Sequence, residues 1–294
     1  MNIKSILRKP FRIIDLYQST QQNCFVAPGH YYSPIVNLSN YKINNNQKWK
    51  DGNSLNGIDL NIEEQKLLVK EFESFYPDVP FQVEKQDSLR YYFNNSYYSY
   101  SDALILHFFI RKFQPKNIIE VGSGFSSAVM LDTRDCFKLN NRLAFIEPYP
   151  ERLKSLLNKS DYSTTTIHEK FVQDVPLDEF KRLEKGDILL IDSTHISKTD
   201  SDVNYILFEI LPILKPGVFI HFHDVFTAFE YPENWIMEGR SWNEDYILRA
   251  FLMNNSAYKI KFFTHHLHQH HREVFNKMPL LYKNHGANIW LEKN

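Results

Sequence analysis

Short apolar runs alternate with segments of helical spacing from residue 102 to the end of the chain. Five of these runs are read as continuously apolar, which is typical of strands that are buried on both faces of a parallel sheet. Segments such as 103–113 and 202–214 repeat apolar residues every three or four positions and predict helices. The five predicted strands are residues 117–121, 143–147, 164–170, 188–192 and 218–224.

This alternation predicts the fold class. A parallel strand pair needs a crossover, usually a helix, to return the chain. Two further runs, at 258–264 and 287–292, have no strong helical pattern between them and predict an antiparallel pair at one edge. We therefore expect an α/β protein with a doubly wound, seven-stranded, mainly parallel, Rossmann-like sheet, an antiparallel terminal hairpin and an N-terminal cap.

The first hundred residues lack strong periodicity. They contain loop signals such as Pro28-Gly29 and the asparagine run at 44–46, one amphipathic helix over 62–75, and a stretch rich in tyrosine and asparagine from Tyr91. We expect an N-terminal extension or cap over residues 1–100 and one α/β domain over residues 101–294.

Composition excludes several protein classes. Hydrophobic residues make up 43% of the 294 residues, which excludes a disordered chain, and 34 Lys and Arg balance 35 Asp and Glu, which gives no overall attraction for nucleic acid or anionic membrane. The two cysteines show no metal-ligand spacing and fit a reducing compartment. The basic N-terminal segment has no signal-peptide core, and no run of about 18 apolar residues occurs. We expect a cytoplasmic protein.

Polar or glycine residues follow every predicted parallel strand. In open α/β sheets, ligands bind outside the carboxyl ends of the strands, where the strand order reverses. A recurrence at five strand ends predicts a binding site there. The residues are Glu120 with Gly122, Ser123 and Gly124, then Glu147, Gln173 with Asp174, Asp192, and His223 with Asp224.

The first of these loops favours a nucleoside ligand. Gly122 and Gly124 would let a cofactor approach the backbone closely, with a helix N-terminus behind them. Glu147 ends the next strand, where a carboxylate receives ribose hydroxyls. Ser127 replaces the third glycine of a dinucleotide fingerprint, and the carboxylate of Glu120 would repel a pyrophosphate. A cationic sulfonium cofactor suits this strand end better.

The segments 117–132, 143–150, 186–195 and 211–226 together resemble class I S-adenosylmethionine-dependent methyltransferases. The resemblance is strongest to the methyltransferase-24 group, relatives of catechol O-methyltransferases, and covers the chain from about Tyr91 to its end. It implies that residues 101–294 are the cofactor-binding methyltransferase domain. It further implies that Glu120 and the loop of Gly122, Ser123 and Gly124 hold the methionine part, Glu147 takes the ribose diol, and Gln173 lies near adenine.

The same resemblance bears on the catalytic end. It implies that the strands ending at Asp192 and Asp224 lie side by side. Adjacent strands are about 4.8 Å apart, so Asp192, His223 and Asp224 should converge beside the sulfonium methyl group. The matching positions of catechol O-methyltransferase-like enzymes carry oxygen ligands for Mg²⁺, whereas His223 stands here where an acid is usual. Imidazole suits Mn²⁺, Fe²⁺ or Zn²⁺ better. Two alternatives stay open: these residues hold a divalent metal (Mg, Mn or Fe), or no metal binds and a histidine accepts the proton.

Three further groups of residues were candidates for chemistry. His223 and His195, with Asp192, are the catalytic candidates, and both histidines could equally be loop residues, whereas His221 is interpreted as a core histidine. The aromatic residues within 226–246 either cover an acceptor pocket or pack against the terminal strands. The histidines from His265 to His271 have no regular ligand spacing and predict a solvated connection.

The expected function is O-methylation of a hydroxylated small molecule, such as a sugar or a natural-product-like acceptor. The alternatives are an NAD-dependent oxidoreductase and a non-catalytic binding protein on a methyltransferase scaffold. We expect a small-molecule acceptor as partner, no nucleic acid and no membrane insertion, and leave open whether the chain forms a homo-oligomer.

Overall fold

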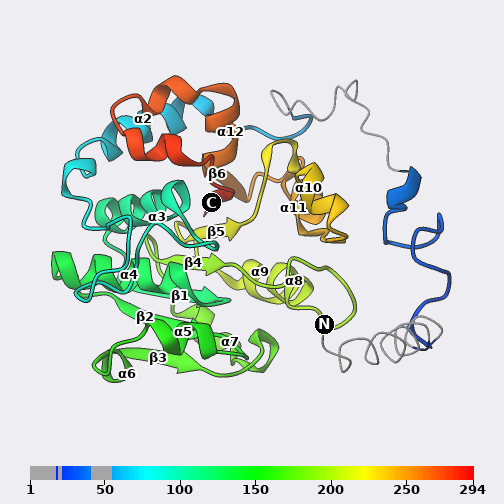
Figure 1. Ribbon diagram of the computed structural model, residues 1–294, viewed down its shortest axis with the longest axis horizontal. Helices are drawn as coiled ribbons and strands as arrows, with labels where there is room; N and C mark the ends of the chain where they lie inside the picture. The colour runs from blue at the N-terminus through cyan, green and yellow to red at the C-terminus, as the bar shows by residue number, and fades with distance from the viewer. Residues whose placement is uncertain (1–17, 19–21, 41–54) are drawn as a thin grey trace, which may run out of the picture. The chain divides into compact units, whose positions relative to one another are not determined.

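A computed structural model describes residues 18, 22–40 and 55–294 (Figure 1). The basic N-terminal stretch and the asparagine run at 44–46 lie outside these residues. The chain divides into two compact units, one of residues 1–47 with 231–242 and the other of residues 48–230 with 243–294. The second unit contains the sheet and all the predicted site residues.

The seven strands form one sheet in the order β3-β2-β1-β4-β5-β7-β6 (Figure 1). Strands β1 to β5 are parallel, and β7 runs antiparallel to both β5 and β6. The expected fold class is confirmed, and the order reverses between β1 and β4. The strands are β1 (Asn117–Val121), β2 (Arg142–Ile146), β3 (Thr165–His168), β4 (Ile188–Ile191), β5 (Phe219–His223), β6 (Tyr258–Phe263) and β7 (Asn288–Lys293).

Helices cover both faces of this sheet and complete two apolar cores. Side chains alternate across each strand, so that Ile118 and Leu190 lie in one core and Ile119 and Leu189 in the other. The helices are α2 (Ile62–Phe72), α3 (Tyr100–Phe113), α4 (Phe125–Phe137), α5 (Glu151–Leu156), α6 (Asp161–Thr164), α7 (Leu177–Lys181), α8 (Asp202–Tyr205), α9 (Leu211–Ile213), α10 (Glu233–Met237), α11 (Glu244–Leu252) and α12 (Thr264–His270). A π-helical segment, η5 (Ile206–Ile210), joins α8 to α9, and the 3₁₀ turns are η1 (Leu38–Asn40), η3 (Tyr76–Asp78), η4 (Val172–Asp174), η6 (Thr227–Phe229), η7 (Arg272–Phe275) and η8 (Pro279–Lys283).

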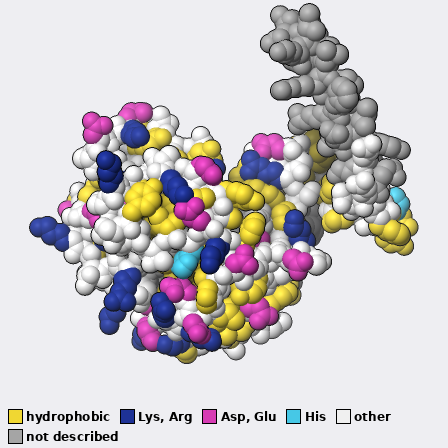
Figure 2. All heavy atoms as spheres, turned by 90° about the horizontal axis from the view of Figure 1, so that it is seen from below, with side chains coloured by type: hydrophobic (Ala, Val, Ile, Leu, Met, Phe, Trp, Pro, Cys, Tyr) yellow, Lys and Arg dark blue, Asp and Glu magenta, His cyan; other side chains and the backbone are white. Residues whose placement is uncertain are grey.

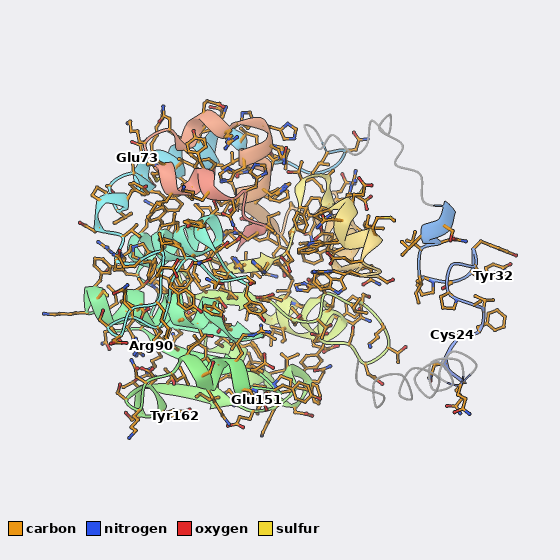
Figure 3. All side chains as sticks on the ribbon, viewed as in Figure 1. Cys24, Tyr32, Glu73, Arg90, Glu151 and Tyr162 are labelled. Carbon is orange, nitrogen blue, oxygen red and sulfur yellow. The ribbon has the colours of Figure 1, made fainter. Side chains whose placement is uncertain are left out.

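Residues 55–100 pack on the α/β domain. The predicted amphipathic helix is α2, which contacts β6, and its Phe72 ring lies 5.5 Å from Phe108 and 5.7 Å from Phe262 between ring centroids. Arg90, labelled in Figure 3, forms ion pairs with Asp132 of α4 and Asp161 of α6. The division near residue 100 into cap and domain stays a prediction.

The connection between β6 and β7 differs from expectation. It contains α12, η7 and η8, and the prediction that His265–His271 is a solvated connection is wrong for His266 and His268, which are buried. The His268 ring stacks on Phe275 with 4.4 Å between centroids, and α12 packs against α3. The lack of ligand spacing does not imply exposure to solvent, because imidazole rings also pack well against aromatic side chains.

The surface and the helices bear on two other expectations. On the face shown in Figure 2, acidic and basic side chains are interspersed, in keeping with a net charge of −1. Throughout the described part of the chain, every helix is too short or too polar to cross a bilayer.

Candidate active site

The loop after β1 is built around Gly122. This residue has φ +82°, and a Cβ atom there would lie 1.7 Å from the carbonyl oxygen of Asp192. The amide of Gly122 donates to the Ile146 carbonyl at 2.9 Å, and the amide of Asp192 donates to the Val121 carbonyl at 2.9 Å. Only glycine fits, because the loop lies directly against the ends of β2 and β4.

Glu120 lies beneath this loop. Its side chain is fully buried and accepts hydrogen bonds from Ser126 Oγ at 2.5 Å and from Ser127 Oγ, and Ser127 Oγ also accepts from the amide of Gly124 at 3.0 Å. Burial raises the pKa of Glu120 to about 8, so the group is largely neutral at pH 7. The structure therefore places the side chain of Glu120, a residue of β1, against the first turn of α4, where it fixes the loop. Its predicted contact with the methionine part of a cofactor stays a prediction.

Glu147 connects two loops. Its Oε2 accepts from the amide of Ser123 at 3.1 Å, and its Oε1 accepts from the amide of Tyr149 at 2.9 Å. Each oxygen keeps a further lone pair for a ligand. The carboxylate thus ties the loop after β1 to the loop after β2.

A cleft of about 840 Å³ opens beside these loops at the reversal point of the sheet. Its lining includes Gly122, Glu147, Gln173 and Asp192, as the sequence predicted for a nucleoside site. Gln173 Nε2 donates to the Asp200 carbonyl at 2.8 Å, while its buried Oε1 has no hydrogen-bond partner among the described residues. This orphaned acceptor points to a donor supplied by a ligand.

A second cavity of about 210 Å³ adjoins the cleft, and both share Gly122, Glu147, Asp192 and Ser193 in their lining. It also contains Arg152 at the start of α5, whose guanidinium lies 3.9 Å from the centroid of the Tyr97 ring. Sequence reasoning missed Arg152 and Tyr97. The available signals were an arginine in the first turn after β2 and the tyrosine-rich stretch that precedes α3.

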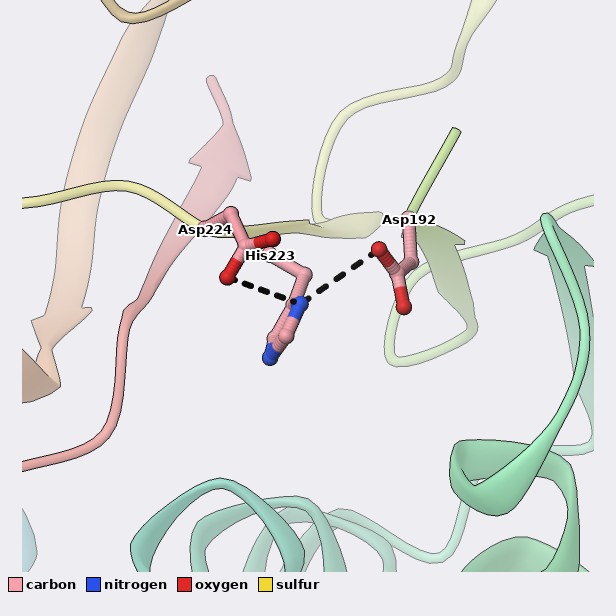
Figure 4. A group of neighbouring side chains, drawn as sticks. All are labelled: Asp192, His223 and Asp224. Atoms are coloured by element: carbon pink, nitrogen blue, oxygen red, sulfur yellow. Dashed lines mark ion pairs between the residues drawn. The ribbon is translucent and has the colours of Figure 1, made fainter. Parts of the chain in front are cut away.

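The strand ends of β4 and β5 bring Asp192, His223 and Asp224 together (Figure 4). His223 Nδ1 lies 3.4 Å from Asp192 Oδ1 and 3.4 Å from Asp224 Oδ1, and one ligand atom of each residue falls within 4.8 Å of the others. In the described part of the chain, no other trio of His, Cys, Asp or Glu gathers as closely, so the α12 histidines form no such group. The predicted convergence is present in the structure.

His195 lies at the same cluster. Its Nε2 is 3.5 Å from Asp192 Oδ1 and 3.6 Å from Asp224 Oδ2, and its Nδ1 is 2.8 Å from Glu244 Oε2. The backbone has φ +60° at His195 and +57° at Asp224. Positive φ at a side chain with a Cβ costs about 1–3 kcal/mol and concentrates at functional sites.

The charges of the cluster perturb one another. Burial disfavours the imidazolium of His195, but Asp192 and Glu244 outweigh it and raise the pKa of His195 to about 10. Asp224 and Asp192 likewise outweigh burial at His223 and hold the pKa of His223 well above its usual value. Both nitrogens of His223 are buried, and among the described residues neither has a hydrogen-bond partner.

His221 has a different environment. It is fully buried, its Nε2 lies 3.3 Å from the hydroxyl of Tyr98, and its ring lies against Trp290 with 4.7 Å between centroids. Burial lowers the pKa of His221 to about 3, so the ring is neutral. These contacts agree with the interpretation of His221 as a core histidine.

The aromatic stretch after β5 divides between the two units. Phe229 is buried against Phe263 of β6, with 5.6 Å between ring centroids, which supports the packing interpretation for this residue. Within the other unit, the guanidinium of Arg240 lies 4.2 Å from the Trp235 ring centroid, and the rings of Trp235 and Trp242 lie 5.2 Å apart.

Comparisons with known proteins give one family match and one relative in sequence. A family model described as a methyltransferase domain matches residues 119–225. An uncharacterized protein of Archaeoglobus fulgidus is 34% identical over 169 residues, which are 54% of this chain and 74% of that protein.

Solved structures give more distant likenesses. The O-methyltransferase TomG from Streptomyces achromogenes, solved with SAM, is 14% identical, with a TM-score of 0.46 over 76% of this chain and 96% of that one. The Podospora anserina methyltransferase PaMTH1, solved with SAH, is 14% identical, with a TM-score of 0.42 over 84% of this chain and 92% of that one.

Proposed function

This chain belongs to the class I S-adenosylmethionine-dependent methyltransferases, and from that premise we propose that it methylates a hydroxyl group of a small molecule with the help of a divalent cation. The resemblance of its motifs to this family is confirmed, and the comparisons give no support to a nicotinamide-dependent oxidoreductase or to a non-catalytic binding protein. The observation that carries the proposal is the meeting of Asp192, His223 and Asp224 beside the cleft.

The residues of the two cavities fit S-adenosylmethionine, which supplies an activated methyl group on a sulfonium. The orphaned Oε1 of Gln173 would accept from the adenine amino group, and the remaining lone pairs of Glu147 would accept from the ribose hydroxyls. Arg152 would bind the carboxylate of the methionine part in the smaller cavity. Because Asp192 lines both cavities, it lies where the two parts of the cofactor join.

The cluster of Asp192, His223 and Asp224 fits a divalent cation. His223 has two buried nitrogens without hydrogen bonds, and Asp192 and Asp224 each turn an oxygen toward Nδ1. These three residues would hold the cation, which when bound lowers the pKa of a hydroxyl group beside it. The protein then has to align the acceptor oxygen with the methyl group, a task worth several kcal/mol of the barrier. We infer that the acceptor is a hydroxylated small molecule, such as a sugar or a natural product.

Cofactor binding and turnover test this proposal separately. S-adenosylhomocysteine should raise the melting temperature of the wild-type protein, and NAD should not. His223→Ala and Asp224→Ala should lower kcat about 100-fold or more, while the affinity for S-adenosylhomocysteine in isothermal titration changes less than about threefold. Asp178→Ala, on the exposed face of α7, is the control and should change neither quantity. Equal losses of turnover and cofactor affinity in the two variants would refute the assignment.

A further inference from the structure

Both histidines of the cluster have a buried carboxylate on the nitrogen that faces away from Asp192 and Asp224. His195 Nδ1 lies 2.8 Å from Glu244 Oε2, and His223 Nε2 lies 3.9 Å from Asp102 Oδ1. Four carboxylates thus surround two imidazole rings. Asp102 and Glu244 are buried and Asp192 and Asp224 partly buried, and such an excess of acidic groups calls for a compensating cation.

We propose that His195 is a fourth ligand of the cation, that Glu244 and Asp102 are positioning residues for His195 and His223, and that the site therefore selects a transition-metal dication over magnesium. This inference rests on the proposed function, since it assumes a cation between Asp192 and Asp224.

The distances around His195 support its role as a ligand. Ligand atoms about 2.1 Å from one ion lie roughly 3 to 3.4 Å from one another. His223 Nδ1 is 3.4 Å from one oxygen of each aspartate, and His195 Nε2 is 3.5 and 3.6 Å from the same two side chains. Asp224 turns Oδ1 toward His223 and Oδ2 toward His195. Among the described residues, only Asp192, His223 and Asp224 have ligand atoms that all lie within 4.8 Å of one another, so His195 has to move closer by a side-chain adjustment to become the fourth ligand.

Glu244 holds His195 through the main chain as well as the side chain. The carbonyl of His195 accepts from the amides of Asn243 and Glu244 at 3.1 and 3.2 Å, where α11 begins. These bonds hold the His195 backbone at φ +60°, and the carboxylate of Glu244 fixes the ring orientation. The strained loop thereby presents Nε2 to the two aspartates.

Hydrogen bonds from β7 and from the residue before it hold the Asp102 side chain in place beside His223. Its Oδ1 accepts from the amide of Ala287 at 2.8 Å and from Asn288 Nδ2 at 2.6 Å, and the side chain is only 7% exposed. From this anchored position its Oδ1 lies 3.9 Å from Nε2 of His223, too far for a hydrogen bond, so Asp102 acts on the ring through its charge and leaves Nδ1 for the cation. Carboxylates on the outer nitrogen of a metal-bound histidine fix its tautomer, and their loss commonly weakens metal binding 10- to 100-fold.

The resulting donor set decides the metal. Magnesium requires oxygen ligands in near-octahedral geometry and keeps several waters, whereas imidazole nitrogens favour manganese, iron, cobalt or zinc. Two imidazoles and two carboxylates should therefore bind Co²⁺ or Mn²⁺ more tightly than Mg²⁺.

Metal titration of the full, chelator-treated protein tests the inference without relying on activity. We expect Co²⁺ to bind at least about 100-fold more tightly than Mg²⁺ in wild type. Glu244→Gln and Asp102→Asn should each weaken Co²⁺ binding about 10- to 100-fold, with binding of S-adenosylhomocysteine retained. Asp187→Asn is the matched control, because Asp187 is equally buried but accepts from the amides of Lys116 and Asn117 at the amino ends of β1 and β4, away from the cluster.

A spectroscopic measurement separates a ligand from a merely structural residue. Pulsed electron paramagnetic resonance of the Mn²⁺-loaded protein should show two histidine nitrogen couplings in wild type and one in His195→Gln. Should Glu244→Gln fail to fold, His195→Gln carries the test, since it keeps Glu244.

The outcomes distinguish the inference from the function on which it rests. If the wild-type protein shows no Co²⁺ or Mg²⁺ binding that is lost in Asp224→Asn, the cation in the proposed function is overturned. The inference alone is overturned if metal binding is lost in Asp224→Asn but the wild-type protein binds Mg²⁺ and Co²⁺ equally tightly. It is likewise overturned if the Mn²⁺-loaded wild-type protein shows only one histidine nitrogen coupling. Unchanged Co²⁺ affinity in both Glu244→Gln and Asp102→Asn overturns their positioning role.

Discussion

Replacing Arg90 with methionine should destabilise the protein strongly. The Arg90 side chain is 5% exposed and contacts two carboxylates that are each 1% exposed, with 2.7 Å between Nη1 and Asp132 Oδ1 and 2.6 Å between Nη2 and Asp161 Oδ1. Arg90 Nε adds a hydrogen bond of 2.8 Å to Asp161 Oδ2. Methionine fills a similar volume but leaves Asp132 without its cation and Asp161 with only Arg134 Nη2, 4.0 Å away, and breaking a buried ion pair in this way costs about 3–5 kcal/mol.

Urea denaturation followed by circular dichroism measures this loss. We expect the free energy of unfolding to fall by about 3–5 kcal/mol at pH 7 in Arg90→Met, and by less than about 0.5 kcal/mol in the control Arg182→Met, whose 70% exposed side chain pairs with Glu179 on the surface. Removing the two acids as well, in the triple variant with Asp132→Asn and Asp161→Asn, should recover part of the loss because no uncompensated charge remains.

The loss should also depend on pH with a defined sign. Burial already raises the pKa of Asp132 with Arg90 in place, and removal of the arginine raises it further. A carboxyl with a raised folded-state pKa binds more protons when folded, so its folded state gains stability as the pH falls. The destabilisation by Arg90→Met should therefore shrink between about pH 7 and pH 5. A loss below about 1 kcal/mol at pH 7, or an equal loss at both pH values, would refute the reasoning.

Three further predictions concern the cavities. In urea denaturation, Gly122→Ala should lose at least about 2 kcal/mol more stability than Gly186→Ala. Both positions have positive φ, but only at Gly122 would a Cβ meet backbone, at 1.7 Å, so equal losses would contradict this reasoning. Arg152→Met should weaken S-adenosylhomocysteine about tenfold in isothermal titration and leave adenosine unchanged, since only the former carries a carboxylate; a loss shared by both ligands would rule out the assigned contact. Gln173→Leu should weaken both ligands about fivefold, and an effect confined to S-adenosylhomocysteine would place adenine elsewhere.

The strands that carry the site could be predicted from sequence to within a residue or two. Buried parallel strands such as β1 and β4 are short, continuously apolar and followed by polar residues, so local pattern alone defines them. The rule that parallel strand ends share one side of a sheet gave the candidate residues, and the strand order implied by the family resemblance then brought Asp192 and His223 together.

The remaining features depend on contacts between distant segments. Glu244 lies 49 positions from His195, and periodicity says which face a residue occupies but not which distant residue it meets. The charge state of a buried group is a second such feature. Glu120 was expected to act as an anion, but burial raises its pKa to about 8 and its oxygens are taken by two serines. His268 is likewise buried by its stacking on Phe275, a contact that the local sequence pattern does not indicate.

The double hydrogen bond of Glu147 has a consequence for binding kinetics. One carboxylate accepts from the amides of Ser123, which lines the smaller cavity, and Tyr149, which lines the larger cleft, and so connects the loop after β1 to the loop after β2. A ligand entering this cleft does not have to order either loop, so little conformational entropy is lost on association. Replacing Glu147 would let the two loops move independently, and we expect a lower association rate constant for the nucleoside in addition to the loss of the proposed acceptor for the ribose.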